Sequence, residues 1–189
     1  GEPFNRKELL DITAEMEGHP DNAAPAILGG FCMALIENGN VVAERIDIPS
    51  QWKAVVAIPD FELHTEKARA VLPASYVRSD VVHNIGAVSF LMAAFMYNKP
   101  EYLKFGLDDH VHVPYRLGLI PGSEEIIRSS VKAGAYGATI SGSGPTIIAF
   151  SPSDKAHLVG ESMVSTFKHH GITSSYIVLD FDQSGISAV

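Results

Sequence analysis

The chain has 189 residues, of which 46% are hydrophobic and 19% are charged. This composition is typical of a globular protein and not of a disordered one. The formal net charge is −8, from 22 acidic and 14 basic side chains, and no run of Lys or Arg occurs. Such a protein is a poor candidate for nucleic-acid binding. If it handles phosphate, it must do so locally, with backbone amides, a metal ion or a few arginines.

Cys32 is the only cysteine, so no disulfide can form within the chain, and a reducing compartment is expected. No apolar run approaches the length of a membrane span, and the first residues are too polar for a signal peptide. We therefore expect a soluble cytoplasmic protein. The chain opens without a methionine and enters a helix almost at once, which suggests a part of a longer chain.

The first 50 residues predict two helices and a hairpin. Asn5 and Glu8 resemble a capping box, and the helical pattern that follows ends at Gly18. A short helix is expected in the apolar stretch 23–30. Residues 30–48 predict a β-hairpin, because the Asn-Gly pair in their middle is the strongest two-residue turn signal.

From residue 52 onward the pattern predicts the order strand, helices, strand, strand, helix, strand. The expected elements are a strand at 52–59, helices at 63–72, 79–97, 100–109 and 121–134, two strands around a Gly-rich turn within 135–150, a helix at 153–171 and a strand at 172–181. The helix at 79–97, with Ser79 or Asp80 as its cap, is apolar and is expected to face the core almost all round. The order βαββαβ is that of a ferredoxin-like domain, so the fold class is α+β.

Four turn-forming or polar residues, His19-Pro20-Asp21-Asn22, follow the first helix without a break. They are consistent with a simple turn. They are equally consistent with a polar cluster at the mouth of a site, in which His19 and Asp21 bind a ligand or a proton and Asn22 donates to a phosphate or holds a metal-bound water. Glu15 or Glu17, just before them, would then supply a hard oxygen ligand for Mg²⁺.

Two further segments carry arginines. Thr65 and Arg69 are four residues apart on a predicted helix, so they share a face and together could hold a carboxylate; the alternative is an exposed surface arginine. Arg116 follows His110 and His112, whose spacing raises the question of a metal site. No cysteine or further histidine lies at a matching spacing, so zinc is not expected, and a second arginine for an anionic substrate is the better interpretation.

The stretch TISGSGPT contains Gly142 and Gly144, which allow a tight turn or a close approach of the backbone to a ligand. It is not a Walker loop, because no Lys-Ser/Thr follows, and it is not a dinucleotide fingerprint. Taken alone, the stretch predicts a hairpin turn.

Four stretches together resemble the homoserine kinase branch of the GHMP kinases, in that family's order and spacing and over nearly the whole chain. They are EGHPDNAAPAILGGF, HTEKARAVLP, HVPYRLGLIPG and GAYGATISGSGPT. The last resembles the Gly-rich motif that the superfamily shares, and the first three are much more specific to the homoserine branch. The resemblance implies that residues 1–50 are the remnant of an N-terminal nucleotide and substrate domain and that residues 51–189 are the C-terminal ferredoxin-like domain.

The resemblance also implies roles for residues of this chain. Glu17 is the expected Mg²⁺ ligand, with Glu15 as the alternative. The resemblance places His19, Asp21 and Asn22 around homoserine and phosphate, with Asp21 and Asn22 as the catalytic pair. It places Arg69 and Arg116 on the substrate carboxylate, with Thr65 beside them. It places the Gly-rich residues Gly142, Ser143 and Gly144 close to the phosphates.

The implied reaction transfers the γ-phosphoryl group of ATP to the side-chain hydroxyl of L-homoserine, giving O-phosphohomoserine on the route to threonine. Phosphoryl transfer needs mostly positioning and charge neutralisation. Asp21 could accept the hydroxyl proton, as its counterpart is thought to do in mevalonate kinases, but homoserine kinases are usually described as working without a strong base. Both possibilities stay open.

The family's main nucleotide loop, Pro-x-x-x-Gly-Leu-Gly-Ser-Ser-Ala, lies upstream of the first matching stretch and does not occur here. We therefore expect the 189 residues alone to bind ATP poorly and to be inactive. The missing N-terminal part of the kinase is an expected partner, and a homodimer is a second form of assembly, since the family often dimerises. Two other interpretations compete: a non-catalytic amino-acid-binding module, and a GHMP kinase for another small carboxylated alcohol. The two arginines favour a carboxylate, and the HPDN string with Glu17 favours a kinase.

Overall fold

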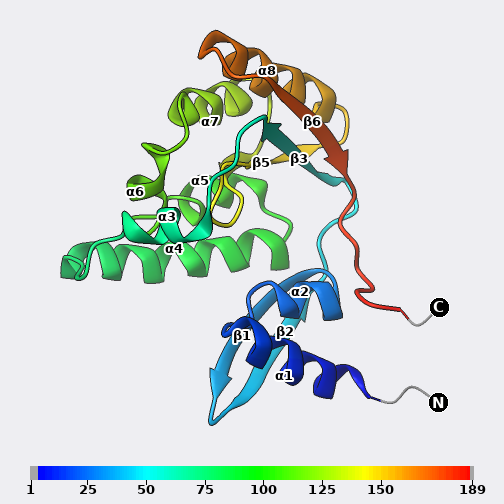
Figure 1. The fold of residues 1–189 in the computed structure, drawn as a ribbon. Helices are drawn as coiled ribbons and strands as arrows, with labels where there is room; N and C mark the ends of the chain where they lie inside the picture. Colours follow the sequence, from blue (N-terminus) through cyan, green and yellow to red (C-terminus); the bar gives the residue numbers. More distant parts are fainter. Residues whose placement is uncertain (1–3, 188–189) are drawn as a thin grey trace. The chain divides into compact units, whose positions relative to one another are not determined.

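The computed structural model describes residues 4–187 (Figure 1). The chain divides into two compact units. The residues up to Pro49 and those from Phe181 onward form the first unit, and Ser50–Asp180 form the second. The interpretation of residues 1–50 and 51–189 as parts of an N-terminal and a C-terminal kinase domain stays a prediction.

The first unit begins with helix α1 (Arg6–Glu17), whose start confirms the predicted capping box. The Asn5 side chain accepts a hydrogen bond from the Glu8 amide at 2.9 Å, and the Glu8 carboxylate accepts one from the Asn5 amide at 2.8 Å. The helix ends at Gly18, which adopts a left-handed conformation with φ 78°. Helix α2 (Ala23–Leu28) follows after a short turn.

Strands β1 (Phe31–Glu37) and β2 (Asn40–Ile46) form the predicted antiparallel hairpin. Both turn residues, Asn38 and Gly39, have positive φ, as the tight Asn-Gly turn requires. The hairpin is a two-stranded sheet, and the small core beneath it comes mostly from the helices. The buried residues of that core are Leu10, Ala14, Ala23, Ala24, Ile27 and Val41.

The C-terminal residues return to the first unit. The Gly30 amide donates to the Asp182 carbonyl at 2.7 Å, and the Gln183 side-chain amide pairs with both backbone groups of Ile48. Gly29, with φ 76°, has no room for a side chain, because a Cβ there would lie 2.6 Å from the backbone of Gln183. This close approach holds the C-terminal segment against the end of α2.

The second unit is built on a four-stranded sheet. Its strands are β3 (Trp52–Pro59), β4 (Gly137–Ile140), β5 (Ile147–Pro152) and β6 (Ser174–Leu179), in the spatial order β4-β5-β3-β6, with every neighbouring pair antiparallel. Numbered within the unit, this is the order 2-3-1-4 of a ferredoxin-like βαββαβ sheet. The predicted fold class is therefore confirmed.

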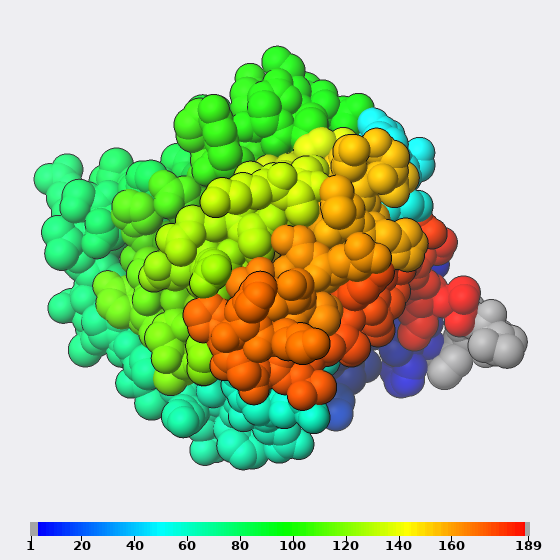
Figure 2. Space-filling model, turned by 90° about the horizontal axis from the view of Figure 1, so that it is seen from above, coloured from blue at the N-terminus to red at the C-terminus, as the bar shows by residue number. Residues whose placement is uncertain are grey.

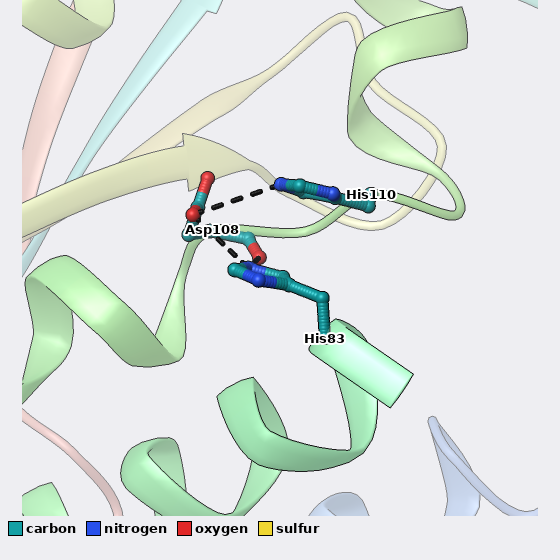
Figure 3. A group of neighbouring side chains, drawn as sticks. All are labelled: His83, Asp108 and His110. Atoms are coloured by element: carbon teal, nitrogen blue, oxygen red, sulfur yellow. Dashed lines mark hydrogen bonds and ion pairs between the residues drawn. The ribbon is translucent and has the colours of Figure 1, made fainter. Parts of the chain in front are cut away.

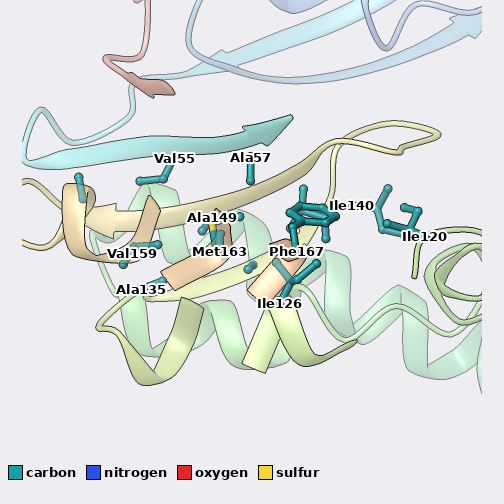
Figure 4. Packing of buried hydrophobic residues seen from close by; sticks show 13 residues of the cluster. Val55, Ala57, Ile120, Ile126, Ala135, Ile140, Ala149, Val159, Met163 and Phe167 are labelled. Carbon is teal, nitrogen blue, oxygen red and sulfur yellow. The ribbon is translucent and has the colours of Figure 1, made fainter. Parts of the chain in front are cut away.

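Helices α7 (Ser123–Lys132) and α8 (Ala156–His169) cover one face of this sheet, and Figure 2 shows them side by side on its outside. Alternate strand residues such as Val55 and Ala57 point toward these helices, as the period of two in a strand requires. They meet the buried side chains of Met163 and Phe167 in the main hydrophobic core (Figure 4).

Five helical segments of different lengths lie between β3 and α7 in the chain. They are α3 (Thr65–Ala70), α4 (Arg78–Met96), η1 (Pro100–Tyr102), α5 (Leu103–Gly106) and α6 (Val113–Leu117). The sequence patterns predicted all of them except α6.

The prediction that α4 faces the core almost all round is wrong. Only Ala87, Ala94 and Phe95 of this helix are buried. Phe95 packs at the C-terminal end of the helix against Trp52 and Phe150, with ring centroids 5.1 and 5.6 Å apart. The apolar residues that α4 and its flanks expose are Val77, Val81, Val82, Ile85, Val88, Phe90, Met96 and Tyr97. The C-terminal end of the helix packs against aromatic residues of the sheet and another side packs on α5, whereas these exposed residues have no described element of this unit to cover them.

The start of α4 and its composition also differ from expectation. The helix begins after Val77, without a side-chain cap, and not at Ser79 or Asp80.

Among the described residues α4 is also the one helix long and apolar enough to cross a membrane, with a mean hydropathy of 1.3 in its most apolar window and 17% of that window buried. The expectation that no stretch approaches that length needs this correction.

Candidate functional site

The HPDN segment links α1 to α2 in the first unit. Gly18 donates its amide to the Ala14 carbonyl, which closes α1 and turns the chain. The His19 Nδ1 atom lies against Asp21 Oδ1, and the same carboxylate oxygen accepts a hydrogen bond from the Asn22 amide at 3.1 Å. The segment is thus a turn and also a polar cluster, and its Asp21 side chain is 74% exposed.

Asn22 occupies the N-cap position of α2, but its side chain makes no capping hydrogen bond there. Glu15 and Glu17 are both exposed on the last turn of α1. Exposed carboxylates of this kind suit a hard cation such as Mg²⁺. Which of the two would be the ligand stays a prediction.

In the second unit, Arg116 on α6 connects three segments. Its Nε atom donates to the Ala68 carbonyl of α3 at 3.3 Å, and its Nη1 atom donates to the Gly142 carbonyl of the Gly-rich turn at 3.2 Å. A guanidinium group is planar, so two bonds to fixed carbonyls set its orientation. The Nη2 atom takes part in neither of these two bonds.

Residues predicted to accompany Arg116 lie on the segments that it joins. The hydroxyls of Thr65, on α3, and Ser143, in the Gly-rich turn, are 3.5 Å apart. Arg69 directly follows Ala68 on α3 and is exposed. The structure therefore brings the helix of Thr65 and Arg69, the helix of Arg116 and the Gly-rich turn together in one place.

The Gly-rich turn connects β4 to β5, as its sequence predicted. Gly142 and Gly144 have φ values of 59° and 83°, and the Ser141 amide donates to the Thr146 carbonyl at 2.8 Å. A Cβ on Gly142 would meet nothing within 4 Å, so its positive φ alone calls for glycine. At Gly144 a Cβ would lie 2.8 Å from a methyl of Ile120. The turn therefore offers open backbone at Gly142.

Asp109 was not predicted, although it organises the segment that carries Arg116. Its carboxylate accepts hydrogen bonds from the amides of Val111, His112 and Val113 and from the side chain of Asn84, at 2.6 to 3.1 Å. Burial alone would raise the pKa of Asp109, but these hydrogen bonds outweigh it and hold the pKa below its ordinary value. An Asp placed shortly before a Pro in the first turn of a helix is a helix-start signal that could have revealed it.

Comparison with known proteins first defines the class. Residues 101–169 match the family model described as GHMP kinases C terminal. These residues lie in the second unit, which is therefore similar to the C-terminal domain of the GHMP kinases over that range.

The similarity then extends over nearly the whole chain to proteins named homoserine kinase. The chain is 43% identical over 185 residues to that of Carboxydothermus hydrogenoformans and 39% identical over 189 residues to that of Desulfitobacterium hafniense. The crystal structure of homoserine kinase from Cytophaga hutchinsonii matches with a TM-score of 0.91 and 31% identity. These alignments cover 98–100% of this chain but only 60–64% of the relatives, so the chain spans about three fifths of their length.

Proposed function

We propose that this chain forms part of a cytoplasmic homoserine kinase, which transfers the γ-phosphoryl group of ATP to the side-chain hydroxyl of L-homoserine. The product is O-phosphohomoserine, on the route to threonine. The names of the relatives that match 98–100% of the chain support this proposal. The chain's own residues support it through the chemistry of the HPDN segment and of the residues around Arg116.

The observation that carries the proposal is the fixed orientation of Arg116. Its bonds to the carbonyls of Ala68 and Gly142 place a planar cation where α3 meets the Gly-rich turn. An amino-acid carboxylate pairs well with such a group, because the guanidinium donates two parallel hydrogen bonds. Arg69 would supply the second positive charge, and Thr65 a hydroxyl donor beside it.

The phosphate side of the site would come from the other residues of the resemblance. His19 and Asp21 would hold the homoserine, and Asn22 would donate a hydrogen bond to the transferred phosphoryl group. The Gly-rich turn 142–144 would approach the phosphates with its backbone. The homoserine oxygen forms the new bond to phosphorus, the bond from phosphorus to the ADP oxygen breaks, and the hydroxyl proton leaves to Asp21 or to solvent.

Glu17, with Glu15 as the alternative, would hold Mg²⁺. Both are exposed carboxylates on the last turn of α1, and Mg²⁺ takes one or two such ligands and fills its remaining positions with water and phosphate oxygens. The ion, when bound, neutralises phosphate charge during transfer.

The proposal includes the N-terminal part of a homoserine kinase as the partner of this chain, with a homodimer as the second form of assembly. Two apolar surfaces support a partner: the exposed side of α4, and the hairpin, which exposes Leu35, Ile36 and Val42. Two-stranded sheets are marginally stable alone, and neighbouring exposed apolar residues often mark contacts. The 189 residues alone are expected to show no phosphoryl transfer.

The test is an assay of homoserine-dependent ADP release by the full-length protein that contains this chain, with 3-aminopropanol as a comparison substrate that lacks the carboxylate. We expect turnover with homoserine and none with the amino alcohol. Binding of homoserine without turnover would instead identify an amino-acid-binding module. Turnover of another hydroxy acid in preference to homoserine would keep the kinase and correct its substrate.

A further inference from the structure

A group of three potential metal ligands lies in the second unit, outside the cluster around Arg116. His83 projects from α4, and Asp108 and His110 come from the loop between α5 and α6 (Figure 3). One ligand atom from each of the three residues lies within 4.8 Å of the other two. The figure shows the two imidazole rings stacked, with the Asp108 carboxylate beside them and an interaction drawn from it to each ring.

Both imidazoles approach the same oxygen of the Asp108 carboxylate. The Nε2 atom of His83 is 3.0 Å from Oδ2, and the Nε2 atom of His110 is 3.7 Å from it. Tetrahedral ligands around zinc are about 3.3 Å apart, given bonds of about 2.0 to 2.2 Å. These two distances lie on either side of that value, and all three ligand atoms lie within 4.8 Å of one another, so the group approaches the size of a zinc site.

The rings stack with centroids 3.9 Å apart and planes 15° from parallel. To direct both Nε2 atoms at one ion, each ring must turn about its Cβ–Cγ bond, a torsion with a broad energy profile. The Nε2 atom of His83 also lies 3.1 Å from the Asp108 carbonyl oxygen, which is a further oxygen donor at the same place.

The surroundings hold these ligands in position. The Nδ1 atom of His110 lies 3.4 Å from Asp80 Oδ1, and a carboxylate behind a ligating histidine is the usual way in which proteins orient such a ring. The His110 amide donates to Asn84 Oδ1 at 2.7 Å, which ties the loop to α4. These hydrogen bonds thus hold helix α4 and the loop between α5 and α6 together at the three potential ligands.

The donor set selects the kind of ion. Two imidazole nitrogens and one carboxylate suit Zn²⁺ and neighbouring transition metals, whereas Mg²⁺ and Ca²⁺ prefer oxygen ligands alone. The side chains of His83, Asp108 and His110 are 40%, 58% and 38% exposed, so water can complete the coordination. Asp108 and His110 also help to line a hollow of about 440 Å³.

We propose that His83, Asp108 and His110 form a binding site for a divalent transition-metal ion of the Zn²⁺ type, with Asp80 as the residue that positions His110. The site is separate from the Mg²⁺ that a kinase would bind with ATP. It does not depend on the proposed function.

The test uses the purified 189-residue chain, stripped with a chelator and titrated with Zn²⁺ against a chromophoric competitor. We expect one ion per chain, not displaced by excess Mg²⁺. His83→Ala and His110→Ala should each weaken binding at least about tenfold, and Asp80→Asn by about tenfold. The matched control is His112→Ala, since this histidine is on the same loop but outside the group, and it should change binding less than about twofold.

A second measurement needs no variant. Addition of Zn²⁺ to the unaltered chain should shift the imidazole NMR signals of two of its eight histidines. Absence of one-to-one binding would overturn the proposal. It would also be overturned by undiminished binding in His83→Ala or His110→Ala, or by an equal loss in His112→Ala.

Discussion

Replacement of Arg116 separates a substrate-binding role from a purely structural one. The two hydrogen bonds of its Nε and Nη1 atoms go to backbone carbonyls and orient the group, and the carboxylate of homoserine would bind the remaining edge. A hydrogen bond to a charged group contributes about 1.5–3 kcal/mol. Arg116→Ala should therefore raise KM for homoserine about 10- to 150-fold. Arg116→Lys keeps the charge but loses the planar fork, so it should fall between Ala and the unaltered protein.

The assay is steady-state ADP release by the full-length protein, with homoserine and ATP varied separately. KM for ATP should change less than about twofold, because the lost interaction belongs to the amino-acid substrate. Arg128→Ala is the matched control, since this arginine is 66% exposed on α7 and pairs only with nearby Glu124 in the described contacts. Equal rises in both KM values, or no rise in either, would refute the assignment of Arg116 to the carboxylate.

Three stability predictions concern the 189-residue chain. In urea unfolding, Gly106→Ala should lower the free energy of unfolding by about 1–3 kcal/mol, because the new Cβ would lie 2.6 Å from the Leu91 backbone. The control is Gly86→Ala on helix α4, where a Cβ would meet no atom within 4 Å. This change should raise the free energy of unfolding by up to about 1 kcal/mol. The hydrogen bond from Lys7, and after it the one from the Val41 amide, lowers the pKa of Asp11 below its ordinary value of 3.8. The ionised carboxylate therefore stabilises the folded chain at pH values above 3.8, and this stabilisation is lost as the pH falls further and the carboxylate is protonated. Melting curves of Asp11→Asn and the unaltered chain should accordingly converge as the pH falls below that value, and a gap that widens would contradict this. Phe95→Ala should cost about 3–5 kcal/mol, whereas Ile85→Glu, at a 65% exposed position of the same helix, should leave the melting temperature nearly unchanged.

Local signals predicted the fold of this chain well. The strand at 52–59 was predicted with the bounds that the structure gives, because an apolar β-branched run between turn residues has few alternatives. The Asn-Gly turn located the hairpin, and the order of elements gave the ferredoxin-like sheet. The strand and the hairpin depend on residues close together in sequence, whereas the sheet pairs strands far apart and was indicated only by the order of the elements.

The candidate site was predicted in part. The structure places the helix of Thr65 and Arg69 beside Arg116 and the Gly-rich turn, an arrangement that the sequence could suggest only through its resemblance to a family. The roles of these residues, and of His19, Asp21 and Asn22 in the first unit, stay predictions. Asp109 escaped notice because its partners are backbone amides, which a sequence does not display.

The clearest error concerns the surface that α4 turns toward its surroundings. The helix was judged to face the core because its apolar residues outnumber the others, but composition shows only that a surface needs cover and not which element supplies it. Zinc was not expected at His110 because ligands were sought close by in sequence, whereas the nearest imidazole comes from α4. Yet Asp80, His83 and Asn84 are spaced i, i+3 and i+4, so they form one polar face of an otherwise apolar helix. In the structure that polar face meets the loop of Asp108 and His110. The spacing of these three residues was therefore the feature of the sequence that indicated that this part of α4 packs against polar groups and not against the core.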